Sequence, residues 1–357
     1  MCTAVQERRG AVSGNQTPDT PIARGEARGW SHNPSLPIGV NPTFAWPPRP
    51  AAALGWIGGT WLRLTPMVIM FLCAIVGNVL LPDAERMKTL AHGWVLEILL
   101  RNGVLITLVA GGLHLYFITL AGQGKKLKFD PRDQARSNRQ FLFNSQVHEN
   151  VFFSLVSGTT LISAFEVVYH WAAANGLVPS FRLSLDQPLS IVGFAALLLV
   201  IPAWSSLHFY WVHRLLHWPP LYRIAHRLHH KNVNVGPWSG VSMHPIEHVL
   251  YYSSVLIHFV LPTTPLLFIF HVCYEHLSPP FSHSGFEKVV IRDRERLKAG
   301  DFFHQLHHRH FECNYGTSEM PWDVWFGSFD NGTTESRERQ RARLQAAKRE
   351  APQEDGA

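Results

Sequence analysis

The chain has 357 residues, of which 46% are hydrophobic and only 16% are charged, whereas soluble domains carry roughly 25% charged residues. The formal net charge of +6 does not lie on one amphipathic face, which argues against a nucleic-acid-binding protein. The four cysteines form no CxxC pair, so neither a disulfide framework nor a cysteine-ligated zinc site is expected.

The two ends of the chain differ in composition from the middle. Residues 1–55 are rich in Pro, Gly and Arg and predict a disordered extension, and residues 331–357 are almost wholly polar and predict a disordered tail. Between them we expect N-terminal transmembrane helices and a basic loop over residues 56–140. A second domain, over residues 141–330, contains most of the histidines.

Long apolar runs predict an all-α, multi-pass membrane protein. Leu64–Leu81 and Gly103–Ala121 are close to the ~20 residues that a spanning helix needs. Val151–Ala174 and Pro188–Leu207 are further candidates. Val249–Tyr274 is a fifth apolar run, but prolines interrupt it.

The distribution of charge suggests how these segments are oriented. The loop Lys125–Arg139 holds six Lys or Arg against two Asp, and such loops remain on the cytoplasmic side. Two spans then return the chain to that side near His208. Pro262 and Pro265 favour a helical hairpin over a straight fifth span. A hairpin keeps the histidines before and after it on one side of the membrane.

Sixteen of the 21 histidines lie between His208 and His310, and many are spaced for one helix face. Positions i and i+4 on a helix have Cβ atoms ~6 Å apart, so such a pair can bind one metal ion. The sequence contains one HxxxH motif and two HxxHH motifs. Their histidines are His213 and His217; His226, His229 and His230; and His304, His307 and His308.

Eight imidazoles exceed the usual four to six ligands of one ion, which indicates two metals. Imidazole suits Zn, Cu, Fe and Ni, so ligand type alone does not choose the metal. The three motifs contain no Cys and no carboxylate, which argues against iron–sulfur clusters and against the carboxylate-rich sites of helical bundles.

The motifs HRLLH at 213–217, HRLHH at 226–230 and HQLHH at 304–308 resemble the three histidine boxes of the fatty acid hydroxylase superfamily, which includes sterol desaturases. Further landmarks follow in order: HPIE at 244–247, HSG at 283–285, and NYGT at 314–317 followed by PWDVWFGS at 321–328. The resemblance covers roughly residues 140–330. It implies two non-haem irons held by the eight box histidines in a cytosolic cap on a helical membrane domain.

The resemblance also implies His283 as a further ligand. His244 and His248 form another i, i+4 pair, which we expect either to bind a metal or to contact a ligand. Glu247 and Asp323 are expected to accept hydrogen bonds from the free ring nitrogens of ligands. The alternatives are an ordinary charge at a helix start for Glu247 and a turn or cap residue for Asp323.

Iron is inferred from the resemblance and from chemistry, because zinc has no redox activity. The expected protein is an O₂-dependent oxidoreductase that hydroxylates or desaturates a sterol, hopanoid, fatty acyl chain or ether lipid. No flavin- or dinucleotide-binding motif is present, so electrons are expected from a separate cytochrome b5 or ferredoxin-like protein. The alternative is a histidine-rich zinc-binding or zinc-transporting membrane protein. The C-terminal residues are not an ER-retrieval signal, which favours a bacterial cytoplasmic membrane over the ER.

Overall fold

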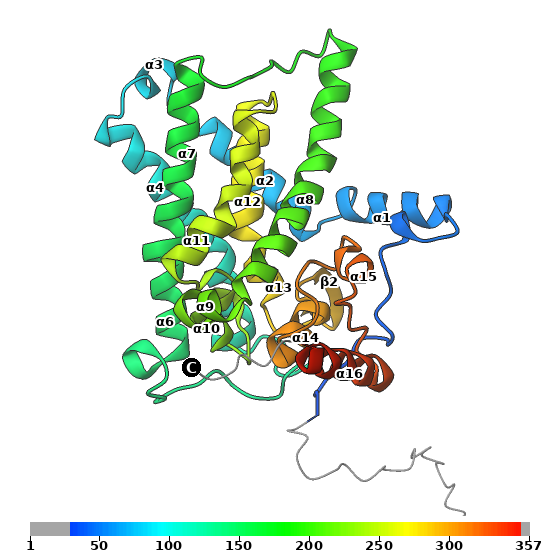
Figure 1. Ribbon diagram of the computed structural model, residues 1–357. Coiled ribbons are helices and arrows are strands. Elements are labelled where there is room, and N and C mark those ends of the chain that lie inside the picture. Colours follow the sequence, from blue (N-terminus) through cyan, green and yellow to red (C-terminus); the bar gives the residue numbers. More distant parts are fainter. Residues whose placement is uncertain (1–28, 351–357) are drawn as a thin grey trace, which may run out of the picture.

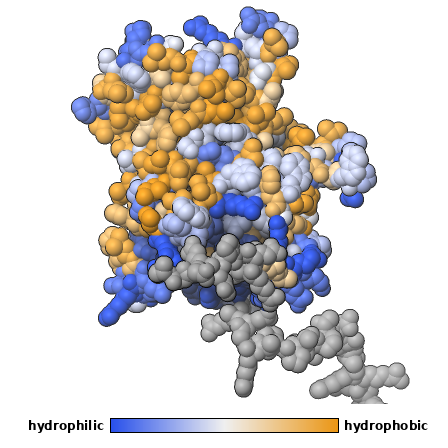
Figure 2. Space-filling model, in the orientation of Figure 1, coloured by the Kyte–Doolittle hydropathy of each residue, from blue (hydrophilic) through white to orange (hydrophobic). Residues whose placement is uncertain are grey.

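The computed structural model describes residues 29–350 and is mostly helical (Figure 1). Three of its helices are long and apolar enough to cross a membrane: His92–Thr119, Gln146–Ala174 and Pro188–Leu216. They agree with three of the predicted spans, although the first begins well before Gly103. Figure 2 shows hydrophobic residues gathered over the upper part of one face, with hydrophilic residues at the top margin and along the bottom. These features describe a helical membrane protein.

The first two of the three long helices are built from shorter segments, and the third is a single α-helix. The first comprises α4 (His92–Ile106), η2 (Thr107–Gly111), α5 (Gly112–His114) and η3 (Leu115–Thr119). The second comprises α6 (Gln146–Phe152), η5 (Phe153–Gly158) and α7 (Thr159–Ala174), preceded by η4 (Leu142–Asn144). The third is α8 (Pro188–Leu216), which continues past the predicted end at Leu207 into the first histidine motif.

The predicted span Leu64–Leu81 differs in the structure. Its helix, α2 (Pro66–Val79), has 14 residues and meets the length of a span only together with α1 (Pro50–Trp61). The two are bent by 44° relative to one another. The Thr65 hydroxyl accepts a hydrogen bond from the Val68 amide, and Pro66 occupies the first turn, so a new helix begins there. A short helix, α3 (Ala84–Met87), follows.

The fifth apolar run forms the expected hairpin. Its segments are α11 (Pro245–Tyr252), η8 (Ser253–Phe259) and α12 (Pro265–Leu277). The Ser254 hydroxyl donates to the Glu275 carboxylate at 2.7 Å, and the rings of His258 and His271 are 2.9 Å apart between nitrogens. These contacts place the two arms side by side and antiparallel. The chain therefore returns to the side of the molecule that carries the histidine motifs.

Short helices and one hairpin of strands make up the end of the molecule that holds these motifs. They are α9 (Pro219–Leu221), η6 (Tyr222–His226), α10 (Arg227–His230), η7 (Pro237–Val241), α13 (Pro279–Ser282), β1 (Lys288–Ile291), β2 (Arg294–Lys298), α14 (Phe302–His310) and α15 (Trp322–Trp325). The antiparallel β1–β2 pair was not predicted. Its signal was the β-branched run Val289–Ile291, followed by Arg292 and Asp293, whose positive φ angles of 51° and 58° form the turn.

The core joins the membrane helices to the hairpin. α12 packs closely along α2 and also contacts α7 and α8. One buried ionic cluster lies among the membrane helices: Arg101 of α4 pairs with Glu166 of α7, whose carboxylate also accepts from Asn102 at 2.8 Å. The Arg101 guanidinium donates to the Gly77 carbonyl of α2 at 3.2 Å. This cluster therefore fixes α2, α4 and α7 to each other.

The structure differs from the expected disorder over residues 29–55. The Trp30 ring packs edge-on against Phe302 of α14 at 5.0 Å, and the Ile38 amide donates to the Asn331 carbonyl at 2.9 Å. Trp30 and Ile38 are partly buried against an apolar cluster. This burial of apolar surface stabilises an ordered conformation that the Pro- and Arg-rich composition of the segment does not predict. η1 (Pro42–Phe44) belongs to the same segment. Residues 1–28 lie outside the described part of the chain.

The predicted disordered tail also differs, because α16 (Thr334–Glu350) occupies most of it. Its sequence is rich in Arg, Glu, Gln and Ala, which are good helix formers. The Gln340 amide donates to the Phe329 carbonyl at 3.0 Å and Arg337 to the Gly332 carbonyl at 3.3 Å. Polar contacts of this kind hold the helix without an apolar face. The last seven residues of the predicted tail lie outside the described residues.

Candidate metal centre

Nine histidines converge in two groups within the described residues. In each group the ring nitrogens offered as ligands all lie within 4.8 Å of one another. The first group is His213, His217, His226, His230 and His307, and the second is His229, His283, His304 and His308. The structure thus brings together the eight box histidines and His283.

Local structure explains how the first two boxes face each other. His213 lies in the last turn of α8, and His217 caps that helix. Trp218, Pro219 and Pro220 follow directly, and the residue before a proline is disfavoured in helical conformation. The chain therefore turns back, and η6 and α10 present the second box to the first. The third box comes from α14, which begins where the Asp301 carboxylate accepts the Phe303 amide at 3.0 Å.

The spacing of the ring nitrogens fits metal binding. In the first group three pairs of Nε2 atoms lie 3.1, 3.2 and 3.1 Å apart: His213–His226, His217–His230 and His230–His307. In the second group the pairs His283–His308, His283–His304 and His304–His308 lie 3.0, 3.1 and 3.2 Å apart. Two nitrogens bound to one ion at about 2.1 Å would be separated by roughly 3.0–3.4 Å.

The outer ring nitrogens fix the tautomer of most of the nine histidines. Five of the nine histidines place Nδ1 against an oxygen acceptor. The pairs are His213–Tyr315 carbonyl at 2.6 Å, His226–Glu247 carboxylate at 2.7 Å, His307–Cys313 carbonyl at 2.7 Å, His283–Pro279 carbonyl at 3.0 Å and His229–Ser242 carbonyl at 3.4 Å. With the proton on Nδ1, each Nε2 carries a lone pair directed at its neighbours. Such converging lone pairs repel one another unless a cation lies between them, so the residues fit a metal-binding role.

Burial keeps the rings neutral, as metal ligands must be. Removal from water lowers the pKa of His229 to about 4, and the nearby rings act in the same direction at other members of the two groups. The pKa values of His226, His230, His283, His304, His307 and His308 lie well below 6.5, with burial as the main cause. At neutral pH these side chains therefore offer lone pairs rather than protons.

The structure does not bring His244 and His248 into either group, contrary to expectation. The Nδ1 atom of His244 accepts the Ile246 amide at 3.2 Å, so His244 caps α11. The ring nitrogens of His248 lie 2.9 Å from the Ser157 hydroxyl and 3.1 Å from the Val241 carbonyl. Because His244 is the extended residue before Pro245, the i, i+4 pair does not share one helix face.

Glu247 and Asp323, the two predicted hydrogen-bond acceptors, contact different groups: Glu247 contacts a histidine ring and Asp323 contacts backbone amides. The Glu247 carboxylate contacts the His226 ring directly, as expected. Burial raises the pKa of Glu247, whereas a cation at Nε2 of His226 would favour its ionised form. Asp323 contacts no ligand ring. Its carboxylate accepts the Tyr315 and Gly316 amides at 2.8 and 2.7 Å, and it therefore holds the loop that carries the Tyr315 carbonyl.

Backbone carbonyls are the part of the site that the sequence analysis did not find. Cys313 and Tyr315 each supply one to a histidine of the first group, and Ser242 and Pro279 each supply one to a histidine of the second. Every residue has a carbonyl, so composition gives no signal for this role. The NYGT landmark at 314–317 was the available hint, since it contains Tyr315 and directly follows Cys313.

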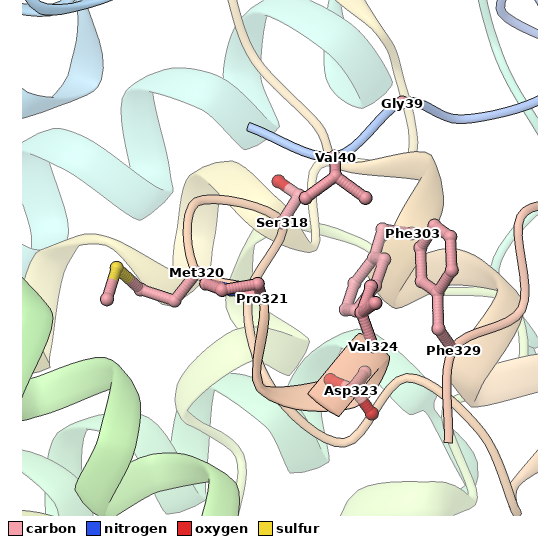
Figure 3. A pocket seen from close by; sticks show the side chains of 9 residues that line it. All are labelled: Gly39, Val40, Phe303, Ser318, Met320, Pro321, Asp323, Val324 and Phe329. Carbon is pink, nitrogen blue, oxygen red and sulfur yellow. The ribbon is translucent and has the colours of Figure 1, made fainter. Parts of the chain in front are cut away.

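Two cavities in the described part of the chain have no histidine in their lining. A small cavity of about 10 Å³, enough for about one water molecule, is lined by Phe303 of α14, Asp323 and the N-terminal residues Gly39 and Val40 (Figure 3). The N-terminal segment therefore lies next to α14, the helix that carries the third histidine box. A larger apolar groove of about 460 Å³ lies between α4 and α7, lined among others by Leu100 and Val104.

Comparison with known proteins agrees with the class of protein that the fold and site define. Residues 197–328 match the family Fatty acid hydroxylase. A Δ(7)-sterol 5(6)-desaturase of Gibberella zeae is 32% identical over 127 residues, which are 35% of this chain and 38% of that protein. A Δ(7)-sterol 5(6)-desaturase of Aspergillus fumigatus is 28% identical over 249 residues, covering 63% of this chain and 74% of the relative. A Δ(7)-sterol-C5(6)-desaturase of Nicotiana tabacum is 26% identical over 242 residues, covering 66% and 82%. No solved structure matches the chain.

The chain is thus a helical membrane protein with a paired histidine centre. Residues 197–328 are similar to the fatty acid hydroxylase family, and the relatives named above are sterol desaturases, which are oxidoreductases. The match with the Gibberella zeae desaturase spans little more than a third of that protein's length.

Proposed function

We propose that this chain is a multi-pass membrane oxygenase that holds two non-haem irons at the cytosolic side and oxidises a C–H bond of a lipid. The convergence of nine histidine nitrogens in two groups carries the proposal. Five ligands in one group and four in the other leave coordination positions free on six-coordinate ions. Iron is favoured over zinc because the relatives are desaturases and zinc has no redox chemistry.

The bound irons would supply the oxidising power of O₂ chemistry, while the protein supplies binding and orientation. Hydroxylation consumes O₂, two electrons and two protons, and it yields an alcohol and one water. Desaturation consumes the same reactants and yields an alkene and two waters. The carbonyls of Tyr315 and Cys313 and the Glu247 carboxylate hold three ligand rings in fixed orientations. The buried, neutral rings keep the site poor in water and rich in lone pairs.

The names of the relatives suggest the substrate class. They are desaturases of Δ(7)-sterols, and we therefore propose a sterol or a similar polycyclic lipid that enters from the bilayer. Electrons would come from a separate carrier protein. The division into helices over residues 56–140 and a catalytic domain over residues 141–330 remains part of this proposal.

The proposal is tested by lipid profiling of cells that make the wild-type chain or its His229→Ala/His307→Ala variant. Each substitution removes one ligand from one group. A host that contains sterols and a competent reductase should show a lipid that gains one oxygen, or loses two hydrogens, only with the wild type. The matched control is His244→Ala, because His244 lies outside both groups. Tightly bound zinc without O₂ consumption would instead support the histidine-rich zinc protein.

A further inference from the structure

One ligand of the centre lies next to the protein surface. Of the nine histidines, only His217 is partly exposed as a residue, although just 4% of its side chain is accessible. The other eight are buried. Solvent therefore comes closest to the ligands beside His217.

Four exposed residues lie within ten positions of His217 along the chain, in or directly after the last turn of α8 and in the η6–α10 segment that packs against it, and we call them the His217 surface: Arg214, Trp218, Arg223 and Arg227. All four are exposed, and Trp218 is 57% exposed. Arg214 lies within electrostatic range of the Tyr315 hydroxyl, and Arg227 within range of the Tyr222 hydroxyl. Both hydroxyls belong to rings that pack against His217, at 5.0 and 5.7 Å between centroids.

The balance of charge on the His217 surface is positive. In the part of the chain that the structure describes, neither Arg223 nor Arg227 forms an ion pair with a carboxylate. The nearby acidic side chain, Glu312, is already engaged. It accepts the Tyr315 hydroxyl at 2.5 Å and lies 3.8 Å from the His217 ring.

A single aromatic residue connects this surface to several ligands. The Tyr222 ring lies 5.7 Å from His217, 5.9 Å from His230 and 6.1 Å from His226, measured between centroids. All three histidines belong to the first group. A redox partner seated on the His217 surface would be separated from that group by one layer of aromatic side chains.

From this arrangement we propose that the His217 surface is the docking site of an acidic one-electron carrier protein, an inference that rests on the proposed function. Exposed arginines complement a carboxylate-rich partner and steer its approach. Arg and aromatic residues are also enriched at protein interfaces, and redox encounters need only small ones. Tryptophan and arginine occur beside lipid headgroups too. The position directly over a ligand of the first group favours the carrier.

The test measures electron transfer to the full-length, iron-loaded protein in nanodiscs of zwitterionic lipid. The probe is the soluble haem domain of cytochrome b5, which is acidic, followed by stopped-flow spectroscopy. The variant is Arg223→Glu/Arg227→Glu. The matched control is Arg294→Glu/Arg296→Glu, which makes the same change of charge on the exposed strand β2. Dithionite serves as a reductant that needs no docking.

The wild-type rate should fall as ionic strength rises, and the Arg223→Glu/Arg227→Glu rate should be at least about tenfold lower. The control should stay close to the wild type, and dithionite should reduce all three proteins equally. Equal carrier rates in variant and wild type, or a wild-type rate independent of salt, would overturn the docking site. So would a variant that loses only its binding to anionic vesicles, because its arginines would then face lipid. A wild-type protein that even dithionite cannot reduce would overturn the proposed function itself.

Discussion

The Glu247 carboxylate lies 2.7 Å from Nδ1 of His226 and ties the start of α11 to the second histidine box. We expect Glu247→Ala to weaken metal binding about 10–100-fold, because the His226 ring loses the group that fixes its tautomer and orientation. Glu247→Gln keeps an oxygen acceptor and should lose less. Metal retention against a competing chelator measures the effect. The control His244→Ala removes a cap of the same helix and should retain metal as the wild type does.

The variant His283→Ala tests whether the centre has two separate metal positions or one. The Nε2 atom of His283 lies within 3.3 Å of the Nε2 atoms of His229, His304 and His308, so His283→Ala leaves the second group with three ligands. We expect the variant to lose one of two bound ions and to retain the other. Elemental analysis of purified protein measures this ratio. Loss of both ions together, or of neither, would contradict two separate positions.

His248→Ala is the matched control for that substitution. Its ring is as buried as that of His283, but both nitrogens bond outside the two groups. The ratio of metal to protein should therefore stay unchanged, while the melting temperature falls because the Ser157 hydroxyl and the Val241 carbonyl lose a partner.

The box histidines could be predicted because their spacing is a local property of a helix. His304 and His308 are one turn apart on α14, and this holds wherever α14 lies. His244 and His248 have the same spacing, but Pro245 begins the helix after His244 and removes it from that face. Spacing therefore predicts a ligand pair only where both residues are helical. The split into two groups could not be predicted, since it depends on how α8, α10 and α14 pack.

The first 55 residues show the same limit in another form. Their composition indicates disorder, yet Trp30 and Ile38 pack against a cluster that includes Phe302 and Leu306, far along the chain. Composition describes what a segment can do alone. It contains no information about an apolar surface that another segment provides, and this contact appears only in the folded chain.

Acidification should destabilise the metal-free protein. Burial lowers the pKa of His229 from 6.5 to about 4 in the folded state. As pH falls below 6.5, the unfolded chain takes up protons that the folded chain excludes. The contribution of the neutral His229 ring to the free energy of unfolding is therefore complete above about pH 6.5 and is lost as the pH falls toward 4. The melting temperature in detergent, measured after metal removal, should be lower at about pH 5 than near pH 7. A constant melting temperature over this range would contradict buried neutral rings.

Asp323 should act on the first group through the loop of residues 313–316. Its carboxylate accepts the Tyr315 and Gly316 amides and the Ser328 hydroxyl, the last at 2.6 Å. Asp323→Ala leaves these donors unpaired, at about 1–3 kcal/mol each, and frees the carbonyl that holds His213. We expect weaker binding of one metal ion, with Asp323→Asn restoring part of it. Ser328→Ala removes one donor only and should retain both ions. Equal affinity in Asp323→Ala and wild type would show that the loop is held by other contacts.

The Arg101–Glu166 ion pair should stabilise the membrane helices strongly. Its side chains are 6% and 0% exposed, so Arg101→Met leaves a buried carboxylate without its cation. Loss of one partner of a buried pair costs about 3–5 kcal/mol. The double variant Arg101→Met/Glu166→Leu should recover much of this loss, because it leaves no buried charge. Melting temperatures in detergent, followed by tryptophan fluorescence, measure both. The exposed pair Arg86–Glu97 provides the control, and Arg86→Met should change little because water screens that pair. If Arg101→Met melts at the same temperature as the control, the Asn102 amide and the His170 ring, which lies 3.4 Å from the Glu166 carboxylate, are sufficient partners for Glu166.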